Sequence, residues 1–230
     1  MKKSFFMIAV MAIFAAIMIT GCGGSKQVAS TPQVATTPQQ AVLSLKEQRA
    51  AEQQKMYSTR LTELKKDGWK LSGSTKTLEV ALLDHYIKLY DDENGGYGEL
   101  SGEVSQCKSI NICRQAATNN AINEYANLTG SYVKGKLNTA IAANANIPSA
   151  EVDLLVGGLE RFVAAEIKGV LTESFSLVKE EAGGNRQYKS FFLVSKAAES
   201  AARTKAMEDA LKETKITMET AKEISKFVNE

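Results

Sequence analysis

The sequence predicts an α+β domain, with a small, mainly antiparallel sheet covered by long helices and preceded by a spacer helix. Stretches of helix length, with apolar residues three to four positions apart, dominate the chain after residue 43, whereas strand-like alternation is brief. Two of the three prolines lie before residue 39, which leaves the rest nearly free of helix breakers. After the spacer helix the order is β-α-β-α-α-β-β-α, so we expect helices to cover one face of the sheet.

The first 21 residues have the organisation of a signal peptide. Lys2 and Lys3 form a positively charged start, and the 15 residues from Phe5 to Ile19 are an uninterrupted apolar run. A membrane-spanning helix needs about 20 apolar residues, so this run fits the apolar core of a signal peptide better. We therefore expect residues 1–21 to be absent from the mature protein.

Ile19-Thr20-Gly21-Cys22 resembles the bacterial lipobox, an aliphatic residue and two small residues before a cysteine. This resemblance implies cleavage between Gly21 and Cys22 and attachment of acyl chains, such as palmitate, through Cys22. A chance cysteine after an ordinary signal peptide is the alternative. The residue after Cys22 is glycine rather than the aspartate of the usual inner-membrane retention signal, and no acidic run follows. By analogy we expect a lipid anchor in the periplasmic leaflet of the outer membrane.

Residues 22–42 are expected to be a flexible tether, because residues 23–42 are mostly small or polar and carry only the charge of Lys26. A spacer helix is predicted over residues 43–67. Ser44-Leu45-Lys46-Glu47 forms a capping box at its start, and Asp67-Gly68 ends it. Its apolar residues are sparse, so we expect it to be mostly solvated and docked near its C-terminal end. A coiled-coil dimer is the alternative.

Residues 68–230 are expected to form the α+β domain. A short strand over residues 69–73 precedes a helix over residues 75–90, and a half-exposed strand follows over residues 97–105. In that strand, Leu100 and Val104 point one way and the acidic side chains the other. His85, the only histidine, is predicted at the edge of the apolar face of its helix.

The second half of the domain is predicted to be helix, helix, hairpin and helix. The first helix begins near residue 112 and the second at Pro148. Strands over residues 170–179 and 188–196 form a hairpin around Gly183-Gly184-Asn185. The last helix is predicted from about residue 197 to residue 228. We expect its end to pack on other helices or to leave an apolar stripe for a neighbouring copy.

Three patterns stand out over about residues 68–212. They are the strand Trp69-Lys70-Leu71-Ser72-Gly73, a helix with regularly spaced small residues, and a hairpin that runs into a second alanine-rich helix. The first helix carries Ala116, Ala117, Ala121, Tyr125 and Ala126, the hairpin carries Tyr188, Phe191, Phe192, Leu193 and Val194, and the second helix carries Ala198, Ala201 and Ala202. Together these patterns resemble the FlgP-like outer-membrane lipoproteins. The resemblance implies a non-enzymatic envelope protein with one small α+β domain, oligomeric in some members.

Charge and composition exclude several classes of function. Removal of Lys2 and Lys3 from the 28 basic residues leaves 26, which equals the number of acidic residues. A neutral chain lacks the basic surface that nucleic-acid binding needs. One histidine excludes sites that require two, and the acidic turn at residues 91–93 lacks the spacing of a calcium-binding EF-hand loop. We therefore predict no catalytic residues, no metal, no cofactor and no small-molecule substrate.

Cys107 and Cys113 are the two cysteines besides Cys22. If both lay on one helix they would face apart, but the sequence places Cys107 after a strand, in a loop that can bring the thiols together. An oxidising periplasm favours a disulfide. We predict this bridge, with two free thiols as the alternative.

These observations predict a structural or protein-interaction component of the bacterial cell envelope, anchored by lipid. Its expected partners are envelope proteins or further copies of the chain. An envelope enzyme or small-ligand binder with an unrecognised site is the alternative, and a deep pocket with perturbed acid–base groups would favour it.

Overall fold

The structure is a computed structural model that describes residues 38–91, 95–144 and 149–214. Of these, residues 44–91, 95–144 and 149–214 belong to one compact unit. The predicted signal peptide (residues 1–21), the lipidation site at Cys22 and most of the tether lie outside the described residues. The prediction that the last helix runs unbroken to residue 228 is wrong, because that helix ends at Glu213 and the backbone of Thr214 is extended (φ −102°, ψ 162°). Residues 215–228 themselves lie outside the described residues.

Helix α1 spans Pro38–Lys66. The prediction that Ser44 caps its start is wrong, because the helix begins six residues earlier, at a proline, which fits the first position of a helix. Its predicted end is confirmed. Gly68 has a φ of 80°, and the Trp69 and Gly68 amides donate to the carbonyls of Leu64 and Lys65. This is the glycine-terminated end that completes the hydrogen bonding of the last turn.

The sheet has four strands, β1 (Lys70–Leu71), β2 (Tyr97–Cys107), β3 (Thr172–Glu180) and β4 (Arg186–Ser195). Their order across the sheet is β1-β3-β4-β2, and every neighbouring pair is antiparallel. The hairpin β3–β4 turns at residues 182–184, where Gly183 and Gly184 have positive φ. These features confirm the predicted α+β class and its antiparallel sheet.

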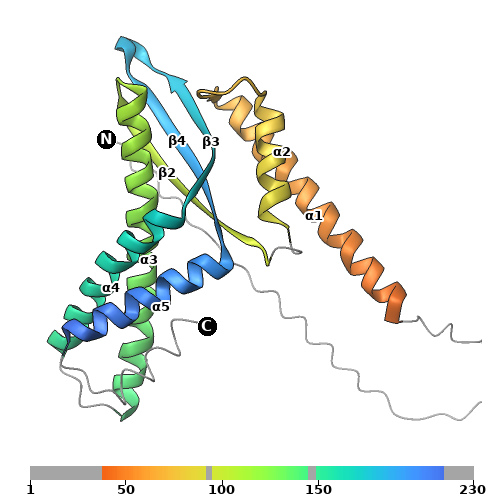
Figure 1. The fold of residues 1–230 in the computed structure, drawn as a ribbon. Helices are drawn as coiled ribbons and strands as arrows, with labels where there is room; N and C mark the ends of the chain where they lie inside the picture. The colour runs from red at the N-terminus through yellow and green to blue at the C-terminus, as the bar shows by residue number, and fades with distance from the viewer. Residues whose placement is uncertain (1–37, 92–94, 145–148, 215–230) are drawn as a thin grey trace, which may run out of the picture. The chain divides into compact units, whose positions relative to one another are not determined.

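Helices cover both faces of this sheet, which corrects the expectation that they cover one (Figure 1). Helices α3 (Ile110–Asn144), α4 (Ser149–Val170) and α5 (Lys196–Glu213) pack on one face, and α1 and α2 (Leu78–Leu89) pack on the other. Successive residues of β4 explain this arrangement. Phe192 and Val194 contact the α3–α5 side, while Phe191, the residue just before Phe192, contacts the α1–α2 side.

Helix α3 approaches β2 closely at Gly102. A methyl group there would lie 1.9 Å from the carbonyl oxygen of Ala117 and 2.7 Å from the amide nitrogen of Ala121. Both alanines are buried against the strand. The regularly spaced small residues of α3 therefore bring the helix backbone against a strand that has no side chain at this point.

Beyond the sheet, α3, α4 and α5 share a second apolar core. Its buried side chains on α3 and α4 include Val133, Leu137, Leu155 and Leu159, and Met207 joins them from α5. Helix α5 begins where the hydroxyl of Ser195 accepts a hydrogen bond from the Ala198 amide. The three long helices therefore stabilise one another as well as the sheet.

Candidate functional site

A cluster of three polar side chains, one fully buried and two partly buried, joins α1, α2 and β2. Glu99 of β2 accepts two hydrogen bonds of 2.8 Å from the guanidinium of Arg60 on α1. The same carboxylate lies 2.5 Å from Nε2 of His85 on α2. The imidazole is fully buried beside the rings of Phe175 and Phe191, and Arg60 lies 4.5 Å from the centre of the Phe191 ring.

The charges in this cluster stabilise one another. Burial would raise the pKa of Glu99, but the hydrogen bonds from His85 and Arg60 and the positive charge of Arg60 outweigh it and lower that pKa to about 2. For Arg60, burial would lower the pKa, but Glu99 raises it above its ordinary value. The pair is therefore ionised at neutral pH, and the cluster ties α1 to the sheet.

The sequence-based prediction for His85 is wrong in one respect, because it lies at the centre of the buried face of α2 rather than at its edge. The buried residues of that helix are Ala81, Leu82, His85 and Tyr86. Glu99 was predicted on the solvent side of its strand, whereas α1 and α2 cover that side. His85 lies three residues after Leu82 and four before Leu89, and this spacing could have indicated that it is buried. No neighbouring residue in the sequence indicates that Glu99 is its charged partner.

A groove opens at the edge of the sheet beside β3, and we call it the edge groove. It has a volume of about 620 Å³ and lies between α2, which covers one face of the sheet, and the first turns of α3, which cover the other. Its floor includes residues 173–176 of β3, and the chain after β1, residues 72–74, borders one end. Its walls are therefore two helix layers, and a sheet edge lies between them.

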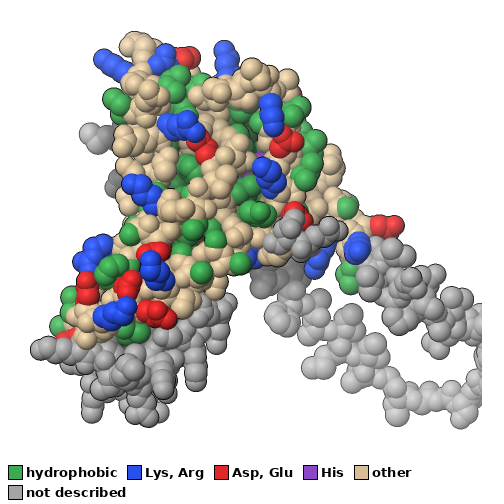
Figure 2. All heavy atoms as spheres, viewed as in Figure 1, with side chains coloured by type: hydrophobic (Ala, Val, Ile, Leu, Met, Phe, Trp, Pro, Cys, Tyr) green, Lys and Arg blue, Asp and Glu red, His purple; other side chains and the backbone are tan. Residues whose placement is uncertain are grey.

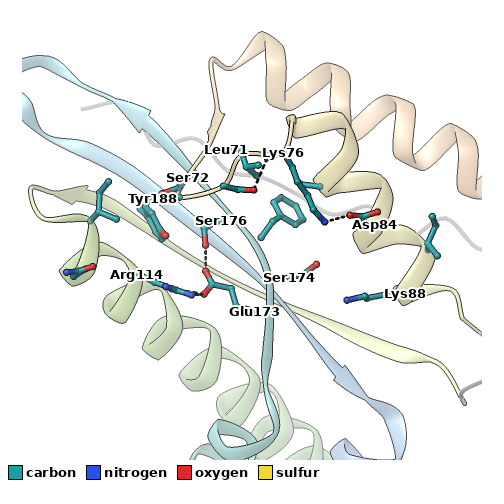
Figure 3. Close-up of a pocket in the computed structure, with 17 residues that line it drawn as sticks. Leu71, Ser72, Lys76, Asp84, Lys88, Arg114, Glu173, Ser174, Ser176 and Tyr188 are labelled. Carbon is teal, nitrogen blue, oxygen red and sulfur yellow. Dashed lines mark hydrogen bonds and ion pairs between the residues drawn. The ribbon is translucent and has the colours of Figure 1, made fainter.

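Charged side chains of the edge groove pair along its walls (Figure 3). On the α3 side, Arg114 donates to Glu173, which also accepts from Ser176. On the α2 side, Lys76 and Asp84 form an ion pair of 2.6 Å. Lys88 points from α2 toward the groove, and among the described residues no hydrogen bond or ion pair is recorded for its ammonium.

Apolar side chains stand at the rim of the edge groove. Ile87 of α2 is 62% exposed and Ile110 of α3 is 42% exposed, although both are large apolar residues. Over the described residues seen in Figure 2, basic and acidic side chains are interspersed with such apolar areas. The groove thus offers apolar contacts on two sides and polar groups at its floor.

Cys107 and Cys113 form a disulfide in the structure, with Cα atoms 5.5 Å apart. The prediction that Cys107 lies in a loop after the strand is wrong, because β2 extends to Cys107, which pairs with Arg186 of β4. Cys113 is buried in the first turn of α3 beside Ala117 and Tyr188. The bridge holds the start of α3 against the sheet. Because Arg114 and Ile110 belong to that same stretch, the disulfide also positions one wall of the edge groove.

Within the described ranges, no group of three or more histidine, cysteine or acidic side chains is placed to hold a metal ion. None of the described helices is long and apolar enough to cross a membrane. Gly21 and Cys22, the predicted cleavage and lipidation residues, lie outside the described part of the chain. Family models, curated proteins and solved structures were compared with the chain, and none matches it. Membership of the FlgP-like family therefore stays a prediction from the sequence.

Proposed function

We propose that the chain is a membrane-anchored bacterial lipoprotein that acts as a structural or protein-interaction component of the cell envelope, without catalytic activity. The lipobox-like sequence ending at Cys22 supports the anchor, and its context favours the periplasmic side of the outer membrane. The edge groove is the observation that supports an interaction role. It is open and is flanked by exposed isoleucines. Its charged side chains pair with each other, Arg114 with Glu173 and Lys76 with Asp84, rather than facing a position where a substrate would react.

Substitution of Cys22 tests the anchor. Cys22→Ser should abolish labelling by a fatty-acid probe and leave unprocessed precursor, because the thiol is the atom that would carry the lipid. Equal labelling of the two proteins would contradict a lipid anchor at this residue. Thr20→Ser, which keeps a small residue in the lipobox, is the matched control and should be labelled normally.

Photo-crosslinking in intact cells tests the interaction role. A photoreactive amino acid in place of Ile87 should give discrete adducts of higher mass, because this residue lies at the rim of the groove. The same substitution at Leu45, which is 59% exposed on α1, is the control and should not give those adducts. Identical adduct patterns at both positions would argue against a specific surface at the groove.

One observation favours a second candidate function. The volume of about 620 Å³ falls within the range of small-ligand pockets. An envelope small-ligand binder would give no protein adducts at Ile87, and a ligand retained through purification would appear in mass spectra of the denatured protein.

A further inference from the structure

Strand β3 has an edge that β1 covers only in part. The β1–β3 register pairs Lys70 with Val178 and Leu71 with Leu177, and the Ser72 amide donates to the carbonyl of Ser176. The chain then turns away at Gly73, whose φ is 66°. On its other side β3 continues to pair with β4 as far as Thr172, which is opposite Leu193. Residues 172–175 are therefore held in the sheet by one neighbour and have no strand on the other side within the described residues.

We propose that the edge groove binds a short extended segment of a partner protein, which adds to β3 as a strand beyond the end of β1. This inference rests on the proposed interaction role and specifies the site and the chemistry of the partner. An unpaired strand edge presents backbone donors and acceptors that an added strand satisfies. Here those groups form the floor of a groove rather than an open surface.

The two walls determine what the added segment looks like. Alternate side chains of a strand point to opposite faces of the sheet. A strand added beside residues 172–175 therefore directs one set of side chains toward α2 and the other toward α3. Because Ile87 stands exposed on the α2 side and Ile110 on the α3 side, both sets meet an apolar contact. The preferred segment is a short apolar run rather than an alternating apolar and polar one.

Two further features limit the length and charge of the segment. The pairing of β3 with β4 shifts register between Glu173 and Phe175, which marks a bulge at Ser174. A bulge twists the edge, so regular pairing is confined to a few residues and the sheet cannot extend without limit. The ammonium of Lys88 points toward the groove from the turn that carries Ile87. An acidic side chain at one end of the apolar run would pair with it.

A display library of random eight-residue peptides tests the proposal, with the mature full-length protein in detergent as the target. Selection should enrich peptides that contain a short apolar run next to Asp or Glu. The Ile87→Asp variant should bind the enriched peptide at least tenfold more weakly. Leu83→Asp is the matched control, since Leu83 is 44% exposed on the same helix but does not line the groove, and its affinity should equal that of the wild type. The site would be overturned if the wild-type protein enriched no peptides beyond those that Ile87→Asp also enriches. Equal losses of affinity in Ile87→Asp and Leu83→Asp would overturn it as well.

A second measurement tests strand addition itself. The enriched peptide, N-methylated at alternate backbone nitrogens, keeps its side chains but loses half of its backbone donors. We expect at least a tenfold loss of affinity for one of the two methylation registers, and slower amide exchange over residues 172–175 when the unmodified peptide is bound. Equal affinity of both methylated peptides, with unchanged exchange, would overturn the proposed mode. The fatty-acid labelling and crosslinking results do not depend on these peptides, so failure here is distinguishable from failure of the proposed function.

Discussion

Arg60 and Glu99 meet in two parallel hydrogen bonds of 2.8 Å, although they are 39 residues apart and belong to α1 and β2. Their side chains are only 25% and 23% exposed, so water screens the pair weakly. Among the described contacts of α1, this is the charged link to the sheet, and the apolar side chains of Tyr57, Leu61 and Leu64 pack around the same end of the helix. The C-terminal turns of α1 are therefore fixed to the sheet by this pair and by these apolar contacts.

The first prediction concerns the pH dependence of this link. Glu99 has a pKa of about 2 in the folded protein, against an ordinary value of 4.5. The folded state therefore binds fewer protons than the unfolded state between these values, and stability falls as the pH falls through this window. Glu99→Gln lacks this titration and leaves Arg60 without its anion. We expect the variant to lose about 2 kcal/mol at pH 7, a difference that shrinks toward pH 2.

Denaturant unfolding at a series of pH values from 2 to 7 measures this difference. Glu103→Gln is the matched control, because Glu103 lies on the same strand in an exposed pair with Lys189. An exposed pair contributes little to stability, so this variant should follow the wild type within about 0.5 kcal/mol. Parallel stability profiles for Glu99→Gln and the wild type would contradict the assigned charge of Glu99.

The second prediction concerns the contact between α3 and β2. Gly102→Ala forces a methyl group against the backbone of Ala117, which cannot move without shifting the whole helix. We expect a loss of at least about 3 kcal/mol in the free energy of unfolding. Gly135→Ala, on an exposed turn of α3 with no atom within 4 Å of the new methyl group, is the control. It should stabilise the helix by about 0.5–1 kcal/mol, and similar effects of both substitutions in thermal melts would contradict the close approach.

Local signals in the sequence predicted the elements better than their assembly. The glycine at position 68, the glycines of the β3–β4 turn and the small residues of α3 each act on their own neighbourhood, so the end of α1, the hairpin and the helix were predictable. The capping box at Ser44 misled because a proline six residues earlier also fits a helix start. The alternation of residues 97–105 correctly predicted a strand with two different faces. It could not show that the face of Glu99 is covered, because the covering residue Arg60 lies 39 positions away in the sequence.

The edge groove was out of reach for a related reason. It exists because β1 stops after two residues, and because α2 and the start of α3 lie on opposite faces of the sheet beside that edge. No single segment carries either fact. The sequence shows that Ile87 and Ile110 are apolar, but it does not show that they stay exposed. Their helices also have buried apolar faces, so the exposed positions can be recognised only when the packing of both helices is known. The cysteine pair was predictable, since the expected compartment and the position of Cys107 after a strand both pointed to it.

The last prediction concerns the disulfide and the groove wall that it positions. The double substitution Cys107→Ser and Cys113→Ser removes a bridge that closes a short loop, with a sequence separation of 6. We expect a loss of about 2 kcal/mol in the free energy of unfolding.

Because the bridge holds the first turns of α3, amide exchange should quicken over residues 110–114, while the shared core of α4 and α5 should exchange at its original rate. Reduction of the wild type should reproduce both effects, and Ser105→Ala, at an exposed position of β2 near the bridge, is the control that should change neither. Alkylation of the denatured, unreduced protein should modify neither cysteine. Two modified cysteines in protein taken directly from the periplasm, or an unchanged exchange rate at residues 110–114 in the double variant, would contradict the role assigned to the bridge.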